Sequence, residues 1–300
     1  YQTNTEDLLL ARNLPYTSGY TDVLQNIGST KTTGVELGLN ANIIDNGTFT
    51  WDVNFNITSY NEEITELALR DENGNSVDDT GNEWFIGEPI RVFFDYRKIG
   101  IWQANEVDLA RDTENKVPGE IKLQDVDGDG VITPDDRVII GTDIPDFTGG
   151  ITNRLSFAGF DLSFFFYFKQ GHTIDSRFHD SNNSLFARYN NLDVDYWTID
   201  NPTDAYPRPN QNQERPRDDD TMRYFDGSFI KLRNVTLGYN LPSSITDRLG
   251  MSSMRIYASA QNSWFGAKYD TWDPEIDEDD IESGNIPTSK LFLMGINVKF

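Results

Sequence analysis

The sequence predicts an all-β protein, the wall of a transmembrane antiparallel β-barrel with about ten strands. Hydrophobic and polar residues alternate along most regular segments, which places apolar side chains on one face of a sheet. These segments have roughly ten residues each, the length that a tilted strand needs to cross a bilayer, whereas strands of globular proteins average about 5–6 residues. Tight connections alternate with very long ones, as is typical of outer-membrane barrels.

The alternation is clearest in four segments. Apolar residues occupy the odd positions of 33–43 and 49–58 and the even positions of 160–170 and 290–300. Further strand-like segments are 1–10, 89–103, 151–157, 228–240 and 254–264. Within 228–240 the alternation changes phase near Arg233, which predicts a β-bulge there.

The connections predict which end of each strand faces the cell exterior. Tight turns at 45–48 and 158–161 fit the periplasmic side. Long loops on the extracellular side are expected at about 61–88, 104–149, 172–227 and 265–289. When strands are assigned alternately inward and outward, one crossing is missing between 61 and 150. We expect it within 62–70, 89–103 or 115–125, which brings the total to about ten in one domain over 1–300.

Composition excludes several classes of function. The 300 residues contain 25 Lys+Arg against 49 Asp+Glu, a net charge of −24 that argues against a nucleic-acid partner. The absence of Cys excludes disulfides and thiolate catalysis, and two His make a His-rich metal site a poor fit. The chain begins at Tyr1 without a signal-peptide pattern, so we expect it to be part of a longer protein.

One acidic motif predicts a cation site. Asp125, Asp127 and Asp129 alternate, Gly130 follows and Asp136 closes the motif. This is the pattern of a twelve-residue EF-type calcium loop, in which position 7, here Val131, offers a carbonyl. Position 12 is normally Glu, and the shorter Asp predicts a weaker site. The hard oxygen ligands favour a structural Ca²⁺ over Zn²⁺, and the alternative is a metal-free turn held by Asx hydrogen bonds.

The other clusters of polar residues in the sequence do not predict a catalytic or metal-binding site. The many adjacent carboxylates, such as Glu62-Glu63, are expected to be solvated loop surface, and we predict no enzyme activity. His172 and His179 are expected to be polar loop residues. Aromatic residues near strand ends fit interfacial girdles: Tyr60, Trp84, Tyr96, Trp102, Tyr239, Tyr257 and Trp264. The polar positions expected to face a lumen are Asp52, Asn54, Asn56, Thr236 and Asn240.

Several segments, in the same order along nearly the whole chain, resemble one family. They include Thr33-Gly-Val-Glu-Leu37, Gly100-Ile-Trp-Gln103, the run from Pro118 to Gly150, Phe229 to Tyr239 and Asp273-Pro-Glu275. This pattern resembles the C-terminal part of the SusC/RagA-type TonB-dependent outer-membrane transporters of Bacteroidetes. One departure is Thr33, where the family's strand motif usually has Asn.

The resemblance implies more than the chain contains. It implies a 22-stranded barrel with an N-terminal plug, of which this chain would be the C-terminal part of the wall, without the plug. Phe300 would be the terminal aromatic residue of the barrel-assembly signal. The implied function is nutrient import across the outer membrane, driven through TonB, with a SusD-like surface lipoprotein as lid and a glycan or peptide as substrate. The substrate-binding residues are unknown.

Another class of protein remains open at this point. A secreted or surface-anchored β-rich adhesin or glycan-binding module with a structural calcium site would also have alternating strands. Such a module would be soluble without detergent, and its apolar face would pack against a second layer of protein. A siderophore-type receptor is the nearest alternative among transporters.

Overall fold

A computed structural model describes residues 1–14, 16–176, 179, 193–210, 212, 216–275 and 288–300. The chain divides into two compact units. Unit 1 comprises Tyr1–Val77, Ile144–His172 and Asp226–Phe300, and unit 2 comprises Asp78–Asp143 and Thr173–Phe225. Most of unit 2 lies in sequence that was predicted as long extracellular loops, about 61–88, 104–149 and 172–227.

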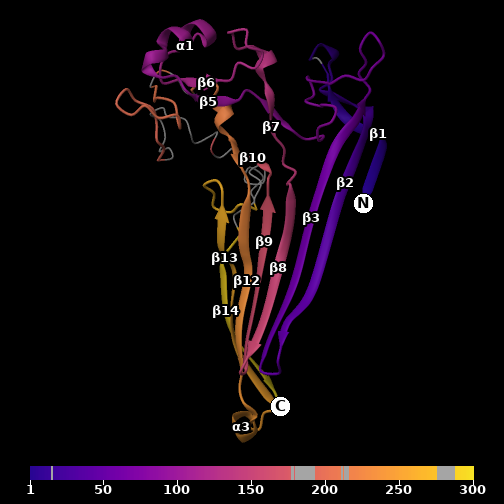
Figure 1. The fold of residues 1–300 in the computed structure, drawn as a ribbon, viewed down its shortest axis with the longest axis vertical. Coiled ribbons are helices and arrows are strands. Elements are labelled where there is room, and N and C mark those ends of the chain that lie inside the picture. Colours follow the sequence, from indigo (N-terminus) through magenta and orange to yellow (C-terminus); the bar gives the residue numbers. More distant parts are fainter. Residues whose placement is uncertain (15, 177–178, 180–192, 211, 213–215, 276–287) are drawn as a thin grey trace. The chain divides into compact units, whose positions relative to one another are not determined.

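Unit 1 is an eight-stranded antiparallel sheet in the order β1-β2-β3-β8-β9-β12-β13-β14 (Figure 1). Its strands are β1 (Gln2–Asn13), β2 (Asp22–Asp45), β3 (Phe49–Leu67), β8 (Phe147–Phe157), β9 (Phe160–Gln170), β12 (Phe229–Asn240), β13 (Ser253–Ala267) and β14 (Leu291–Lys299). Every pairing in this sheet joins two strands of unit 1 that are consecutive along the chain. The sheet is therefore a meander, the topology of an up-and-down wall.

Eight strands replace the ten or so that the sequence predicted. The segment 89–103 was counted as a crossing, but it forms the short strands β4 (Phe93–Asp95) and β5 (Lys98–Ile101) of unit 2. Once this segment is removed, inward and outward strands alternate without a gap. The segment 62–70 supplies the end of β3, and 115–125 contains β6 (Ile121–Leu123), which pairs with β5.

The tight turns form where they were predicted. Asn46 joins β2 to β3, and its side-chain oxygen accepts hydrogen bonds from the N–H groups of Thr48 (3.1 Å) and Phe49 (2.8 Å). Ala158 and Gly159 join β8 to β9 with φ of 51° and 87°, and two positive φ angles suit the twist of a hairpin. Both turns lie at the end of the sheet that carries α3 (Ser243–Thr246) and the C-terminus (Figure 1).

The bulge near Arg233 is confirmed. The register of β12 with both β9 and β13 shifts between Leu232 and Asn234. Because the extra residue restores the side-chain alternation, Leu232 and Val235 lie on the same face of the sheet.

Unit 2 has its own small core. Its remaining elements are α1 (Val107–Glu114), β7 (Val138–Gly141), β10 (Thr173–Asp175) and most of β11 (Tyr224–Asp226), and the pairs are β4 with β7, β5 with β6 and β10 with β11. The core consists of Ile101, Ile121, Leu123, Trp197 and Met222. Short strands and turns are thus held by buried apolar side chains from both chain segments of the unit.

Candidate functional site

One face of the eight-stranded sheet is apolar from β2 to β14. Directly paired residues of an antiparallel sheet lie on the same face, so the register assigns each row. One such row runs across six strands, from β2 to β13, and consists of Leu39, Phe55, Ile151, Phe166, Leu232 and Trp264. The next rows continue with Leu162, Leu237, Ala258 and Met294.

This apolar face is exposed. Val35 is 71% exposed, Leu39 52% and Met294 91%. Among the residues that the structure describes, no protein layer covers the outer strands of this face, and an apolar face of this extent exceeds the apolar patches of soluble monomers. The observation opposes the soluble adhesin alternative, which requires a second layer against this face.

Aromatic side chains gather on the apolar face at the tight-turn end. Phe160 stacks on Tyr239 with ring centroids 4.5 Å apart. Trp51 donates its indole N–H to Asn153 Oδ1 at 2.9 Å, which satisfies a buried amide on the apolar face. Amphipathic rings at the end of an apolar face are typical of a membrane interface.

The predicted girdle is only partly correct. Tyr239 and Trp264 lie on the apolar face, by their pairing with Phe160 and Leu232. Trp84 and Trp102 are instead buried in unit 2, and Trp102 donates its indole N–H to Glu114 at 3.0 Å. Tyr257 is on the polar face, where its ring covers Gly295 of β14.

The opposite face of the sheet is polar, and the five predicted lumen residues all lie on it. Asp52 accepts a hydrogen bond from Asn42 Nδ2 at 3.0 Å, and Asn54 donates to Asn40. Thr236 contacts Ser259 at 2.9 Å across β12 and β13. Asn56 is paired with Gly38 and Gly150, and Asn240 with Arg255. These side chains satisfy one another across neighbouring strands, so the polar face is ordered.

An ion pair crosses a whole strand on this polar face. Arg255 of β13 binds Asp161 of β9 through both Nε (2.9 Å) and Nη2. Gly238 of β12 lies beneath the pair, and a Cβ there would meet Arg255 Nη2 at 2.4 Å and Asp161 Oδ1 at 2.6 Å. The glycine thus leaves the room through which the two charged side chains meet.

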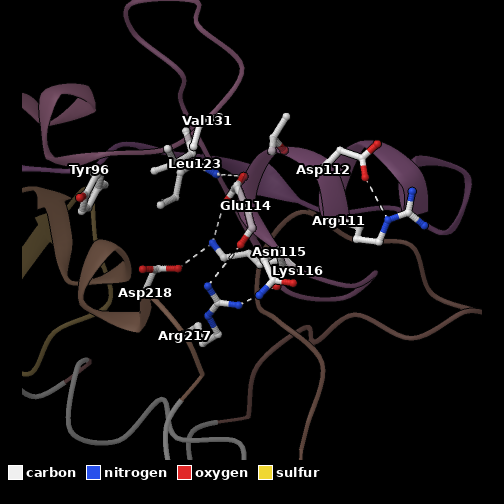
Figure 2. Close-up of a pocket in the computed structure, with 12 residues that line it drawn as sticks. Tyr96, Arg111, Asp112, Glu114, Asn115, Lys116, Leu123, Val131, Arg217 and Asp218 are labelled. Atoms are coloured by element: carbon white, nitrogen blue, oxygen red, sulfur yellow. Dashed lines mark hydrogen bonds and ion pairs between the residues drawn. The ribbon is translucent and has the colours of Figure 1, made fainter.

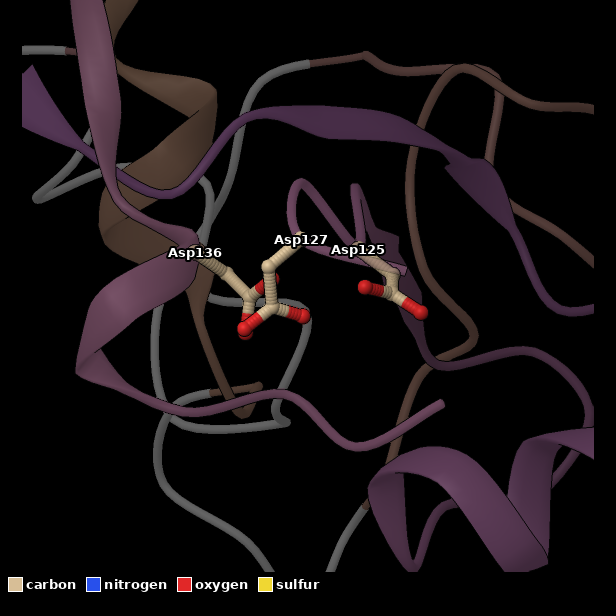
Figure 3. A group of neighbouring side chains, drawn as sticks. All are labelled: Asp125, Asp127 and Asp136. Atoms are coloured by element: carbon tan, nitrogen blue, oxygen red, sulfur yellow. The ribbon is translucent and has the colours of Figure 1, made fainter. Parts of the chain in front are cut away.

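The acidic loop of unit 2 brings three of its four predicted carboxylates together (Figure 3). One oxygen from each of Asp125, Asp127 and Asp136 lies within 4.8 Å of the others. Asp129 does not join this group, and its Oδ1 accepts the N–H of Val131 at 2.8 Å. The carboxylate set matches the chemistry of a Ca²⁺ site, which uses six to eight oxygen ligands.

Backbone hydrogen bonds shape this loop. Asp125 accepts the N–H groups of Gly128 (2.7 Å) and Gly130 (2.9 Å), and Gly130 has φ of 84°. Asp136 is fully buried and accepts the N–H groups of Val126 and Thr133, both at 2.7 Å. These hydrogen bonds hold the pKa of Asp136 below its usual value, so the carboxylate remains ionised.

Beside the acidic loop, unit 2 contains a polar cavity of about 390 Å³ (Figure 2). Lys116 is buried in its wall, and its ammonium contacts Glu114 (2.5 Å), Asp218 (2.6 Å) and the carbonyl of Ile121 (2.7 Å). Arg217 donates to the carbonyl of Asn115 at 2.9 Å, just past the end of α1. Lys116 is thus paired with two carboxylates, whereas Arg217 is held by the backbone carbonyls of Asn115 and Glu114.

Sequence reasoning missed the buried lysines and misplaced the histidines. Lys116 and Lys231 are each about 1–2% exposed, although lysine is rarely buried. Lys231 stands between Ile230 and Leu232 in a strand, which was a signal, but its partners lie 42 to 57 positions away in the sequence. His172 and His179, expected on polar loops, are 4% and 6% exposed, and burial lowers the pKa of His172 to about 4.

Phe300 directly follows β14 and is 87% exposed. Its role in assembly stays a prediction. Among the residues that the structure describes, no helix is both long and apolar enough to cross a membrane.

Comparisons with known proteins place this architecture in a class. No family model matches the chain. Two TonB-dependent receptors of Formosa agariphila are 32% and 30% identical to it, and each alignment covers all of this chain and 32% of the relative. The TonB-dependent receptor SusC of Bacteroides thetaiotaomicron is 28% identical, with 29% of its length covered. The chain thus spans about a third of the length of these relatives.

Solved structures agree. The structure of the RagAB peptide transporter matches the whole chain with a TM-score of 0.75 at 24% identity, over 32% of that chain. The RagAB peptide importer in its closed-closed state matches with a TM-score of 0.72 at 25% identity, over 33% of that chain. The fold is therefore that of the β-barrel wall of TonB-dependent transporters, and closure of the barrel lies beyond this chain's eight-stranded sheet.

In sequence and in fold, the chain is similar to about a third of the length of the TonB-dependent receptors and transporters named above. The similarity extends over the whole of this chain and includes SusC and the RagAB transporter, the type that its sequence motifs resemble.

Proposed function

We propose that this chain is part of the barrel wall of a TonB-dependent importer of nutrients in the outer membrane. The observation that carries the proposal is the two-faced sheet, with one exposed apolar face and one ordered polar face. In a bilayer the apolar face contacts lipid and the polar face lines a water-filled interior. The relatives are named as receptors and transporters rather than enzymes, which fits a wall that does no chemistry on its cargo.

The sheet needs further strands to work in a membrane. β1 and β14 each have one neighbour in the sheet that the structure describes. An unpaired strand edge in hydrocarbon leaves N–H and C=O groups without partners, which is costly. We infer that other strands of the longer protein pair with β1 and β14 and close the wall.

The proposed partners follow from the relatives. The relatives are named TonB-dependent receptors, and the family resemblance implies a SusD-like surface lipoprotein, so we propose both partners for the protein that contains this chain. One solved neighbour is named as a peptide transporter, whereas an oligosaccharide is the alternative cargo. The experiment therefore tests both peptides and oligosaccharides as the imported nutrient.

The test uses the full-length receptor in its native membrane. A deletion strain is compared with a complemented strain for growth on a defined oligopeptide mixture or a defined oligosaccharide mixture as the sole limiting nutrient. We expect the deletion to abolish growth on one of the two, and the receptor to require detergent and to migrate faster on gels before boiling. A receptor that is soluble without detergent, or normal growth on both mixtures, contradicts the proposal.

We further propose that the acidic loop 125–136 binds a structural Ca²⁺. Asp125, Asp127 and Asp136 would provide carboxylate oxygens, with Asp129 and the Val131 carbonyl completing the shell predicted from the motif. Ile132, in the same loop, packs against the core of unit 2, so an ion there would stabilise that core.

Calcium binding is tested by measuring the unfolding temperature of the full-length receptor in the presence of Ca²⁺, Mg²⁺ or a chelator, each at about 1 mM. We expect Ca²⁺ to raise the unfolding temperature with a dissociation constant on the order of 10⁻⁴ M, in the range of extracellular modules. Asp127→Asn should remove the effect. Asp135→Asn is the matched control, because Asp135 lies in the same loop but outside the ligand positions. An equal response of both variants contradicts the proposal.

A further inference from the structure

A buried lysine on the polar face of the wall contacts a connection between two other strands. Lys231 belongs to β12 and pairs in register with Tyr167 of β9 and Phe265 of β13, which places it on the polar face. Its side chain is 1% exposed. The ammonium contacts Asp273 Oδ1 (2.8 Å), Glu275 Oε2 (2.6 Å) and Thr288 Oγ1 (2.9 Å). All three of its N–H donors are thereby used.

The contacting residues come from the connection between β13 and β14. In the sheet, β13 separates β12 from β14, so the returning arm, which touches β12 through Thr288 and then enters β14, passes across the end of β13. Arg233 adds a second link, because it binds Glu275 and lies over the Tyr167 ring at 4.2 Å. Asp273, Glu275 and Thr288 therefore lie beside β12 at the long-loop end of the sheet.

Both arms of the connection meet at one carboxylate. Asp273 Oδ2 accepts the N–H of Thr288 at 3.0 Å and also its hydroxyl. Asp273 Oδ1 accepts the N–H of Glu275 at 3.1 Å. Lys231 touches the outgoing arm through Asp273 and Glu275 and the returning arm through Thr288, so it holds the base of the whole connection.

The charges in this cluster balance. Lys231 and Arg233 supply two cations, and Asp273 and Glu275 supply two anions. Burial alone would raise the pKa of Asp273, but hydrogen bonds from Lys231 and Thr288 hold it below its usual value. A buried ion cluster is strongly destabilised when one member is removed, since the remaining charges lose their compensation. The arrangement thus depends on Lys231 being present.

We propose that Lys231 is a positioning residue that fixes the base of the β13–β14 connection across the polar face of the wall. Under the proposed import function the polar face lines the passage, so the anchored residues Asp273, Glu275 and Thr288 lie at the long-loop end of that passage. The anchoring itself depends only on the contacts within unit 1.

The test measures the mobility of the connection directly. Neither Cys nor a disulfide is present in this chain, so a single spin label can be introduced at Trp272→Cys in the full-length receptor once any cysteines elsewhere are replaced. Trp272 is 67% exposed and precedes Asp273. We expect a restricted spectrum in the parent protein and a several-fold faster label in Lys231→Met. Lys231→Arg, which retains the cation, should restore part of the restriction.

Two controls separate anchoring from general loss of stability. Lys31→Met removes another lysine of the same sheet, which binds Glu63 at 2.8 Å, and it should leave the label at 272 unchanged. A label at Leu69→Cys, in the connection after β3, should not respond to Lys231→Met.

An unchanged spectrum at 272 in folded Lys231→Met overturns the proposal, and so does an equal change at 69. If Lys231→Met does not fold, Glu275→Gln takes its place, because Glu275 is less buried and binds both Lys231 and Arg233. Increased mobility at 272 in that variant supports the anchor, and unchanged mobility overturns it. Label mobility does not require transport, so failure of the import proposal would be seen separately in the growth assay.

Discussion

At the scale of single residues, Gly238 shows how a missing side chain organises the polar face. Its neighbours Asp161 and Arg255 meet over its Cα, and neither could keep its position beside an added methyl group. Glycine inside a strand normally weakens the pairing between strands. Here its presence is explained by packing, because the ion pair occupies the space of a side chain.

We predict that Gly238→Ala destabilises the wall by about 1–3 kcal/mol, because the added carbon overpacks the ion pair. The matched control is Gly38→Ala, also on the polar face, where nothing lies within 4 Å of the new Cβ. That control should be neutral or slightly stabilising. Urea unfolding of the receptor in detergent, followed by the gel shift between folded and boiled protein, measures both. Equal midpoints for the two variants would contradict the account of Gly238.

His172 predicts a dependence of stability on pH. Burial lowers its pKa from 6.5 to about 4, with Lys169 adding to the effect. Between these two values the unfolded chain takes up a proton that the folded chain does not, so stability falls as the pH is lowered from about 6.5 to 4. Above pH 6.5 the residue is neutral in both states and contributes no slope.

We therefore expect His172→Gln to flatten the fall in unfolding temperature between pH 6.5 and 4, compared with the parent protein. Thermal scans in detergent at several pH values in this window measure the difference. If the two curves remain parallel, another group dominates the acid sensitivity and the assignment to His172 is wrong.

At the scale of elements, the faces of the strands were predicted well and their number was not. Period-two alternation depends only on neighbouring residues, so the apolar face of β2, β3, β9 and β14 could be read directly. The segment 89–103 contains comparable apolar residues, but its strands have three and four residues and pair within unit 2. Composition alone does not distinguish a short buried strand from a membrane crossing.

The two faces predict opposite responses to a new charge at similar depth. Leu39 and Asn56 belong to adjacent rows of β2 and β3, Leu39 on the apolar face and Asn56 on the polar face beside two glycines. Leu39→Arg should cost about 2–4 kcal/mol if it lies near the bilayer midplane, whereas Asn56→Arg should cost well under 1 kcal/mol.

Folding into lipid vesicles, measured by the fraction that migrates as the compact form, reports this difference. Equal folding yields of Leu39→Arg and Asn56→Arg would mean that the apolar face does not contact lipid.

The candidate sites were predictable to different degrees, because some depend on neighbouring residues and others on residues that are distant in the sequence. The calcium motif lies within twelve consecutive residues, so its spacing was visible in the sequence. The partners of Lys231 lie 42 to 57 positions away, and their encounter depends on the register of the sheet. Trp102 was expected at a membrane interface, but it is buried in unit 2, where it donates to Glu114, twelve positions away, and lies under Lys122.

At the scale of the whole molecule, the chain contains two compact units with different sources of stability. The wall relies on its strand ladder and on the medium that its apolar face contacts. Unit 2 relies on a core in which Ile121 is fully buried and packs with Ile101, Leu123 and Trp197.

We predict that Ile121→Ala destabilises unit 2 by about 2–5 kcal/mol through the cavity it leaves. The control Val117→Ala changes an exposed side chain of the same unit and should have an effect within about 0.5 kcal/mol. Limited proteolysis with mass mapping should show faster cleavage within 78–143 and 173–225 for Ile121→Ala, while the wall retains its gel shift. Cleavage that rises equally in both units would show that they unfold together.

The order of segments along the chain also constrains how the protein is assembled. Unit 2 draws its two segments from before and after the β8–β9 hairpin, whose ends Phe147 and Gln170 are paired. The first half of that unit is synthesised before the hairpin exists and waits for the second half with its core incomplete. Resistance of unit 2 to protease would therefore report that the chain has been completed beyond the hairpin, in the middle of the wall.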